Sequence, residues 1–285
     1  MAIDVMPIAG RDVGAVAQFL AAHLNSRVPA QVWEQAINVS WRVDAPNHGF
    51  LLREGDRVVG VYLAFYSQRA INGRPERFCN LGAWCVLPEY RFQSVRLLKA
   101  LLAQGGYHFT DLSPSGNVVP LNTRLKFRFL DTSTALVPNL PWPSMPGRIR
   151  VSADPEVIAA TLTGAELQLY QDHVTAAAAR HLVVTDGKDS CYVVFRKDRR
   201  KNLPLFVSVL YVSNSELFHR ATPLLTRHFL VHHRAAATFM ETRVVGRRPR
   251  MSLPMRSSRP KMFRSTGLDG AQIDYLYSEL TCVPW

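Results

Sequence analysis

The segment from Leu81 to Leu102 constrains the fold of this chain more than any other part of the sequence. It reads LGAWCVLPEYRFQSVRLLKALL, an apolar run, a short polar stretch and a second apolar pattern. The first run is typical of a buried strand, which Pro88 ends because proline has no N–H for a sheet ladder. From Val95 onward apolar residues recur at helical spacing. The segment therefore predicts a strand, a loop and an amphipathic helix.

A strand followed by a short loop and a helix N-terminus favours anion binding. The first-turn N–H groups of the helix have no partner within it, and the helix dipole adds positive potential. Such units are common and mostly structural, so the geometry alone does not identify a phosphate site. The identity of the loop residues narrows the interpretation.

The sequence Val86-Leu87-Pro88-Glu89-Tyr90-Arg91, followed by a helix, resembles the signature of the GNAT superfamily of acyl-CoA-dependent N-acyltransferases. In that family the end of the fourth strand polarises the thioester, and the next loop wraps the pyrophosphate of coenzyme A. Arg91 matches the first position of that loop, whereas Ser94 and Arg96 stand where glycine is usual. Glycine allows close backbone approach to phosphate, so Arg96 either adds a charged contact or blocks the site.

The resemblance implies that acetyl-CoA or another acyl-CoA is the cosubstrate. It assigns thioester contact to the backbone N–H of Val86 or Leu87. It assigns cofactor binding to the strand end and the loop, which are Val86, Leu87, Arg91, Phe92, Gln93, Ser94, Val95 and Arg96.

The order of elements in residues 1–135 also resembles the GNAT fold, an α/β fold with a mixed sheet. Strands are expected at 3–8, 50–53, 57–66, 78–86 and 107–111, with a last one after Phe129. Helices are expected at 13–24, around 32–37 and at 95–103, the first capped by Asp12.

The stretch from Val137 to Gly147 contains four prolines and is typical of a crossing between domains. We therefore predict a GNAT domain at 1–136, a Pro-rich linker at 137–150 and a second domain at 151–285. In the second domain we expect a helix at 154–179 interrupted at Gly164, strands at 182–184, 191–196 and 206–211, a helix at 215–233 and a strand at 237–245. This order predicts a tandem, degenerate GNAT-like domain, whose strand at 210–213 lacks the arginine and glycine loop.

Composition restricts the classes of protein to which the chain can belong. Hydrophobic residues make up 47% of 285 residues, enough for a core, but no uninterrupted apolar run is long enough for a membrane span. The first residues do not resemble a signal peptide, and the four cysteines lack metal-ligand spacing, so we expect a reduced, cytoplasmic protein. No metal site is predicted, because no glutamate lies between His228 and His232.

The net charge of +12 is concentrated between Arg243 and Arg264, where eight basic residues occur without an acidic one. This basic arm (243–264) predicts either an anionic partner or a solvated surface segment.

An acyltransferase of this type needs a base for the attacking ammonium. The family's usual acid, a tyrosine, is replaced by Asn122. His48 is the first candidate for the base because histidine titrates near neutrality, and the adjacent Gly49 would allow close approach of a ligand. Glu76 and Asn80 are the second choices. Tyr277 and Glu279 lie in a closing segment that we expect to reach a cleft between the domains.

The leading hypothesis is an acyl-CoA-dependent N-acyltransferase, in the simplest case an acetyltransferase, that acts on the amine of a small molecule such as an amino sugar or amino acid. One alternative is an aminoacyl-tRNA-dependent acyltransferase, with the basic arm holding tRNA phosphates. Another is a non-catalytic GNAT-derived binding module. GNAT relatives often dimerise, so a homodimer is also implied.

Overall fold

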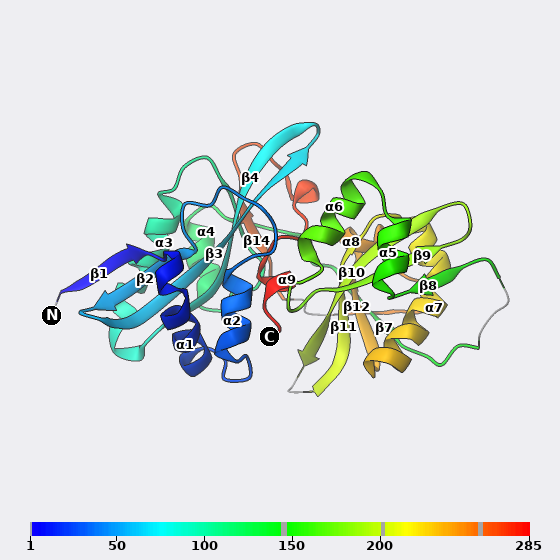
Figure 1. The fold of residues 1–285 in the computed structure, drawn as a ribbon, viewed down its shortest axis with the longest axis horizontal. Coiled ribbons are helices and arrows are strands. Elements are labelled where there is room, and N and C mark those ends of the chain that lie inside the picture. Colours follow the sequence, from blue (N-terminus) through cyan, green and yellow to red (C-terminus); the bar gives the residue numbers. More distant parts are fainter. Residues whose placement is uncertain (1, 144–146, 201–202, 256–258) are drawn as a thin grey trace. The chain divides into compact units, whose positions relative to one another are not determined.

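The computed structural model describes residues 2–143, 147–200, 203–255 and 259–285. Its contacts divide the chain into two compact units (Figure 1). The first unit comprises Met1–Leu130, Pro260–Ile273 and Tyr277–Trp285, and the second comprises Asp131–Arg259 and Asp274–Leu276. Each unit is therefore assembled from separate stretches of the chain.

A seven-stranded mixed sheet forms the centre of the first unit, in the order β1-β2-β3-β4-β5-β14-β6. All neighbouring strands are antiparallel except β4 and β5, which are parallel. The strands are β1 (Ile3–Pro7), β2 (Gly49–Glu54), β3 (Arg57–Ile71), β4 (Arg74–Val86), β5 (His108–Asp111), β6 (Arg128–Phe129) and β14 (Met262–Arg264). The parallel pair needs a crossover connection, and the helix after β4 supplies it.

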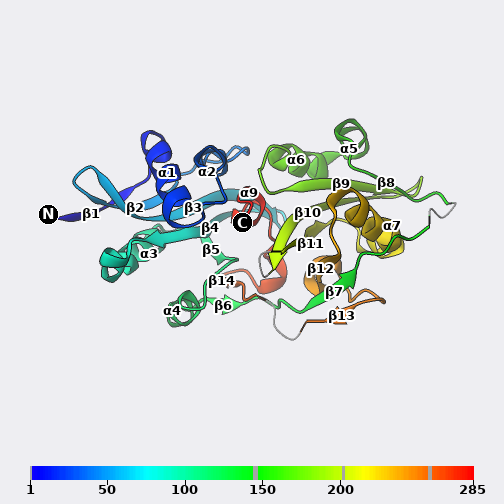
Figure 2. The same ribbon diagram turned by 90° about the horizontal axis from the view of Figure 1, so that it is seen from below.

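Helices cover both faces of this sheet. Figure 2 shows α1 (Val13–His23) and α2 (Ala30–Ile37) on one face, with α3 (Ser94–Leu102) and α4 (Val118–Arg124) on the other. The helix α3 buries Leu97, Leu98 and Leu101 and exposes Lys99, as its apolar spacing predicts. Short 3₁₀ helices occupy Gly10–Asp12, Pro88–Gln93 and Gly270–Gln272, and α9 spans Glu279–Cys282.

The prediction that the Asp12 side chain caps the first helix is wrong. The Asp12 side chain makes no cap hydrogen bond to α1. Its carboxylate instead accepts the N–H of Ala9 at 3.0 Å and pairs with Arg53 at 3.0 Å. Asp12 therefore ties the start of α1 to β2.

The second unit contains another seven-stranded sheet, in the order β13-β7-β12-β11-β10-β9-β8. The strands are β7 (Thr134–Pro138), β8 (Arg150–Ser152), β9 (Arg180–Thr185), β10 (Ser190–Arg200), β11 (Leu203–Val212), β12 (Ala237–Glu241) and β13 (Leu253–Pro254). The helices are α5 (Pro155–Thr161), α6 (Gly164–His173), α7 (Ser215–His233) and α8 (Thr242–Val245). An apolar core forms where α7 packs on the sheet, with Phe195, Phe218 and Phe229 fully buried or nearly so.

The two sheets have the same topology. In the second sheet only β11 and β12 are parallel, which corresponds to β4 and β5 of the first. The strand after each parallel pair comes from a distant part of the chain. In the first sheet this strand is β14, which comes from the C-terminal part of the chain. In the second sheet it is β7, which precedes the other strands of that sheet in the sequence. The architecture is thus a tandem arrangement of mixed α/β sheets, in which the first sheet takes β14 from the part of the chain that follows the strands of the second sheet.

This arrangement differs from the predicted domain boundaries. The predicted linker at 137–150 includes the end of β7 and the first residue of β8, and residues 144–146 lie outside the described part. Residues 260–273 and 277–285, predicted to belong to the second domain, pack in the first unit. The basic arm contains α8, β13 and β14, and Met262 and Phe263 are buried. It is therefore not simply a solvated segment, although its residues 256–258 lie outside the described part.

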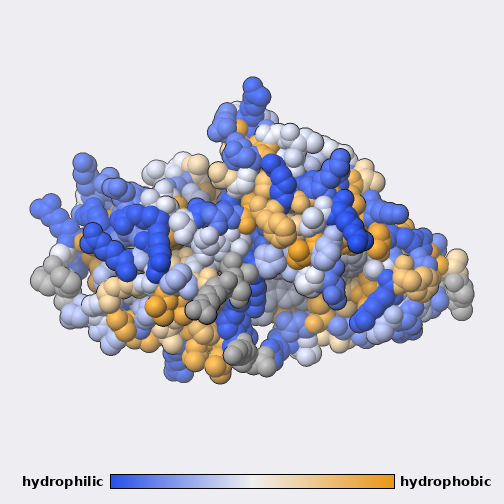
Figure 3. Space-filling view, turned by 180° about the vertical axis from the view of Figure 1, so that it is seen from behind, coloured by the Kyte–Doolittle hydropathy of each residue, from blue (hydrophilic) through white to orange (hydrophobic). Residues whose placement is uncertain are grey.

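Hydrophilic side chains alternate with apolar patches over the face shown in Figure 3. Exposed large apolar residues include Phe92, Val231 and Met251. Among the described residues, no helix combines the length and apolar character that a membrane crossing requires.

Candidate functional site

A bulge in β4 interrupts the regular pairing of β3 and β4 in the first sheet. Val61 of β3 pairs with Cys85, and Leu63 pairs with Gly82, so β4 carries one residue more than β3 across this interval. Ala83, inside the bulge, has a positive φ of 53°, a conformation that is unusual for a residue with a Cβ. The parallel pairing of β4 with β5 is confined to Phe78–Asn80 and His108–Thr110. Beyond Asn80 the two strands therefore separate.

The end of β4 has one backbone N–H that faces away from β3. The N–H of Leu87 donates to the Val59 carbonyl of β3 at 3.0 Å. Because successive N–H groups of a strand point to opposite sides, the N–H of Val86 faces the side from which β5 has separated. Of the two predicted thioester contacts, Val86 has this orientation and Leu87 does not.

The loop after β4 is more regular than the sequence predicts. A 3₁₀ helix, Pro88–Gln93, runs directly into α3, and the N–H of Ser94 bonds to the Arg91 carbonyl. The Arg96 guanidinium donates to the Ile3 carbonyl at 2.9 Å and to Gln93 Oε1 at 3.0 Å. Arg96 and Gln93 thereby hold the start of α3 against β1, and Ser94 and Val95 form its first turn.

Arg91 and Phe92, two of the predicted cofactor-binding residues of this loop, are exposed to solvent. Phe92 is 74% exposed. Arg91 is also exposed, and its guanidinium makes no hydrogen bond or ion pair to the described residues. A cation and an adjacent aromatic ring are thus available to a ligand here.

The C-terminal segment packs against the bulge. A Cβ placed on Gly82 would lie 2.9 Å from the Cβ of Glu279, so the absence of a side chain at Gly82 makes room for this segment. The N–H of Glu279 donates to Asn80 Oδ1 at 2.9 Å, and Asn80 in turn donates to Thr110 Oγ1 at 3.0 Å. Ser278 caps α9, and its side chain accepts the N–H of Leu280. Asn80, predicted as a catalytic residue, thus holds Glu279 in place.

The Glu279 carboxylate is buried but only partly hydrogen-bonded. Oε1 accepts from the hydroxyl of Ser113 at 2.8 Å, whereas Oε2 has no hydrogen-bond partner among the described residues. Burial, together with the nearby negative charge of Asp111, raises the pKa of Glu279 to about 7. Sequence reasoning placed Glu279 near a cleft between domains, whereas the structure places it inside the first unit.

Asp111 is the second buried carboxylate of this site. It ends β5, and its Oδ2 accepts from Asn122 Nδ2 at 2.8 Å. Burial raises the pKa of Asp111 to about 7, while the hydrogen bond from Asn122 acts in the opposite direction. Asn122 therefore serves to hold Asp111. Tyr62 stacks on Trp84 with ring centroids 4.5 Å apart. Burial raises the pKa of Tyr62 well above its usual value, and the negative charges of Asp111 and Glu279 act in the same direction.

His48 does not join these groups. Its backbone connects two strands, since its N–H donates to the Ile8 carbonyl and its carbonyl accepts the N–H of Ala64. Burial lowers the pKa of its imidazole. The adjacent Gly49 has a φ of 109°, and a Cβ there would lie 2.2 Å from the Tyr62 carbonyl oxygen. Gly49 thus permits contact with β3, a role different from the predicted approach of a ligand.

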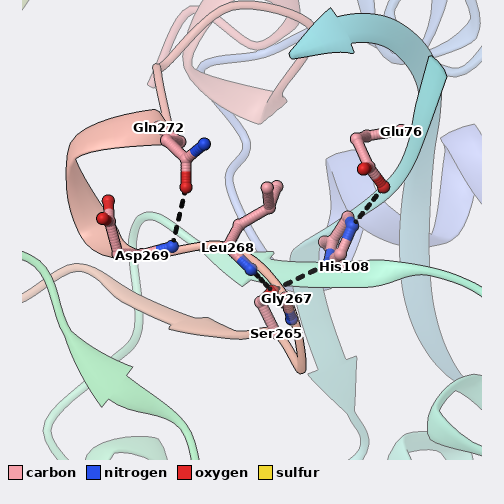
Figure 4. Close-up of polar contacts among 7 residues, drawn as sticks. All are labelled: Glu76, His108, Ser265, Gly267, Leu268, Asp269 and Gln272. Atoms are coloured by element: carbon pink, nitrogen blue, oxygen red, sulfur yellow. Dashed lines mark hydrogen bonds and ion pairs between the residues drawn. The ribbon is translucent and has the colours of Figure 1, made fainter. Parts of the chain in front are cut away.

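Glu76 belongs to a second polar cluster, which Figure 4 shows. Its Oε2 lies 2.9 Å from His108 Nε2, and His108 Nδ1 lies 2.9 Å from Ser265 Oγ. The same hydroxyl oxygen accepts the N–H groups of Gly267 and Leu268. The cluster joins the chain after β14 to the beginnings of β4 and β5, whereas Glu279 lies by the bulge further along β4.

No group of three or more His, Cys, Asp or Glu side chains in the described part of the chain could hold a metal ion. His228 and His232 of α7 are neighbours, with ring centroids 4.5 Å apart.

Sequence comparisons find no matching family model and no matching curated protein. Solved structures, by contrast, match over most of the chain. A GCN5-related N-acetyltransferase from Kribbella flavida is 14% identical with a TM-score of 0.56, and the match covers 92% of this chain and 71% of that one. A GCN5-related N-acetyltransferase from Anabaena variabilis is 11% identical with a TM-score of 0.55, covering 92% and 72%.

N-myristoyltransferase from Saccharomyces cerevisiae, solved with bound myristoyl-CoA, is 10% identical with a TM-score of 0.53. That match covers 95% of this chain and 82% of that one. These matches confirm the predicted GNAT-type α/β fold.

Proposed function

We propose that this protein is an acyl-CoA-dependent N-acyltransferase that transfers an acyl group, acetyl in the simplest case, to the amine of a small molecule such as an amino sugar or amino acid. The observation that carries the proposal is the bulge at Ala83. It lies in the part of β4 that no longer pairs with β5, where the N–H of Val86 faces away from β3 and the buried Glu279 packs on Gly82. The GNAT-type fold supports the same reaction class.

The donor is expected to bind along the end of β4 and the following loop. The N–H of Val86 is oriented to donate to the thioester carbonyl as negative charge develops on its oxygen. Arg91 can pair with the phosphates, and the exposed ring of Phe92 can stack on the adenine base. The start of α3 positions these two side chains, and it is formed by Gln93, Ser94, Val95 and Arg96. The myristoyl-CoA in the yeast neighbour is consistent with a donor of this chemical class.

We assign proton removal to Ser113 and Glu279. Ser113 is exposed, and its hydroxyl donates to the buried Glu279 carboxylate. The amine nitrogen attacks the thioester carbon, forming a C–N bond, and the C–S bond breaks to release the thiolate. The proton lost by the amine passes to Ser113 Oγ as the hydroxyl proton of Ser113 moves to Glu279. A carboxyl with a pKa of about 7 is suited to this exchange at neutral pH.

Asn80 acts as a positioning residue in this scheme, because it accepts the N–H of Glu279. His48 and Glu76, predicted as bases, have backbone and side-chain roles elsewhere in the unit, so the proposal gives Glu279 the role first assigned to them.

The proposal is tested by measuring the melting temperature with acetyl-CoA and with acyl-CoAs of increasing chain length. A ligand that binds only the folded state raises the melting temperature in a saturable way. Arg91→Glu should remove the rise, whereas Lys99→Glu, on the exposed side of α3, should retain it. A chain that shows no rise with any acyl-CoA would contradict the proposal. If the protein instead binds tRNA in a salt-sensitive way, the result would favour the aminoacyl-tRNA-dependent alternative. If it binds neither acyl-CoA nor tRNA, the result would favour the non-catalytic binding module.

A further inference from the structure

The second unit contains a pocket with a volume of about 450 Å³, which lies within the roughly 300–1,000 Å³ typical of small-molecule sites. One wall is a face of α7 that carries His219, Thr222, Pro223 and Thr226. These positions follow helical spacing, so they line one side of the helix. The site is separate from the bulge and the loop of the first unit.

The polar atoms of the α7 wall are already engaged by the helix and its neighbours. The Thr222 hydroxyl donates to the Phe218 carbonyl at 3.1 Å, and the Thr226 hydroxyl donates to the Pro223 carbonyl at 3.0 Å. His219 Nε2 donates to the Val245 carbonyl at 2.9 Å. This wall therefore offers a ligand mainly apolar contacts.

The other walls extend the apolar surface. Val137 and Pro138 end β7, and Leu140 and Trp142 follow them along the chain. Pro249 and Met251 come from the segment after α8, and Met251 is 60% exposed. An apolar ligand in this pocket would cover side chains that water now reaches.

The charges that line the pocket all have one sign. Arg220, Arg247 and Arg250 line it, and none of its described lining residues is Asp or Glu. Arg220 is partly compensated, because its guanidinium pairs with Asp186 at 2.9 Å. Arg247 and Arg250 are exposed and make no hydrogen bond or ion pair to the described residues. Burial lowers the pKa of His219, so the arginines carry the positive charge at neutral pH.

We infer that this pocket binds an amphiphilic carboxylate, with an aliphatic chain between α7 and Trp142 and the carboxylate at Arg247 and Arg250. Charge complementarity selects a carboxylate over a neutral or cationic amphiphile of the same length, because guanidinium groups bind carboxylates with charge-assisted hydrogen bonds. The apolar walls and the volume select an aliphatic chain over a small polar anion.

The test uses quenching of tryptophan fluorescence by a bromine-substituted dodecanoate. The chain has five tryptophans, and Trp142 is the only one whose position falls in the second unit. Saturable quenching is expected, and Trp142→Phe should abolish that component. The Arg247→Glu, Arg250→Glu double variant should weaken binding at least tenfold.

Arg248→Glu is the matched control. Arg248 lies between the two arginines, but its guanidinium bonds to Ser252 and it does not line the pocket. The control should bind as the unchanged protein does, and bromine-substituted dodecanol should bind at least tenfold more weakly than the acid. Saturating coenzyme A should leave the Trp142 signal unchanged, so the result is independent of the proposed function. Equal binding of acid and alcohol, an equal loss in the control, or no Trp142 quenching would overturn the inference.

Discussion

At the scale of single residues, the most unusual feature is a carboxylate buried with an unpartnered oxygen. Glu279 has no exposed surface, and its Oε2 finds no hydrogen-bond partner in the part of the chain that the structure describes. Such burial normally costs free energy unless the group is neutral. The cost is tolerable because the proton is retained to near-neutral pH, and a group that exchanges its proton there is suited to acid–base chemistry.

The raised pKa values predict a stability that falls as pH rises. Unfolded Glu and Asp lose their protons near pH ~4, whereas Glu279 and Asp111 retain theirs in the folded state to about pH 7. The folded state therefore binds more protons between these values, and the free energy of unfolding decreases across this window. Glu279→Gln removes one of these titrations, so at pH ~8 the variant should be more stable by about 3 kcal/mol.

Urea unfolding at several pH values checks this prediction. The advantage of Glu279→Gln should shrink toward pH ~4, where both states of the unchanged protein hold the proton. Glu89→Gln, on the exposed 3₁₀ helix, is the control and should follow the unchanged protein. An identical pH dependence in all three proteins would contradict the assignment.

The Glu76–His108–Ser265 cluster leads to a different residue-scale prediction. Because His108 bonds both to Glu76 of β4 and to the chain beyond β14, we interpret the cluster as a structural link. His108→Ala should lower the free energy of unfolding by about 1–3 kcal/mol through the partners left unsatisfied. In the proposed acyl transfer it should leave the pH dependence of the rate unchanged. A shifted pH–rate profile with unchanged stability would instead indicate a catalytic role.

At the scale of elements, the bulge in β4 and α9 depend on each other. Gly82→Ala would place a Cβ 2.9 Å from the Cβ of Glu279 and 3.1 Å from the ring of Phe65. Since overpacking of a well-packed region costs ~1–3 kcal/mol, urea unfolding should show a loss of that size. Gly105→Ala is the control, because a Cβ there meets nothing within 4 Å. Equal stability of the two variants would mean that α9 does not pack tightly on Gly82.

Long elements with clear periodicity could be predicted from the sequence. The helix at 215–233 agrees with α7 at both ends, and Asn214 caps it by accepting the N–H of Leu217. The hairpin of β2 and β3 and the helix α3 were also predicted, with boundaries that differ by a few residues. Such segments carry their signal locally, as apolar spacing and turn residues.

The strands β7 and β14 and the buried carboxylates could not be predicted in this way. β14 has three residues within a basic stretch, and β7 ends in the proline-rich one, so neither shows a strand pattern of useful length. Nothing near Glu279 in the sequence marks it as buried. Its environment comes from Gly82, Asn80 and Ser113, which lie far away along the chain.

At the scale of the whole molecule, the two sheets differ in how far along the chain their strands are collected. All seven strands of the second sheet lie within residues 131–259. The first sheet needs β14, from residues 262–264, between β5 and β6. The first unit also needs the segment that carries Glu279, whose side chain packs on Gly82.

This asymmetry predicts the behaviour of fragments. A fragment of residues 131–259 should fold and unfold cooperatively, whereas a fragment of residues 1–130 should not, because β5 and β6 lack their shared partner and polar groups of both strands are left unpaired. Circular dichroism during urea unfolding distinguishes the two cases. A chain truncated after residue 259 supplies a second measurement: limited proteolysis should degrade its first half and leave a resistant core that begins near residue 131. Cooperative unfolding of the 1–130 fragment would show that β14 is dispensable, because a sheet that persists without its sixth strand cannot depend on that strand for its stability.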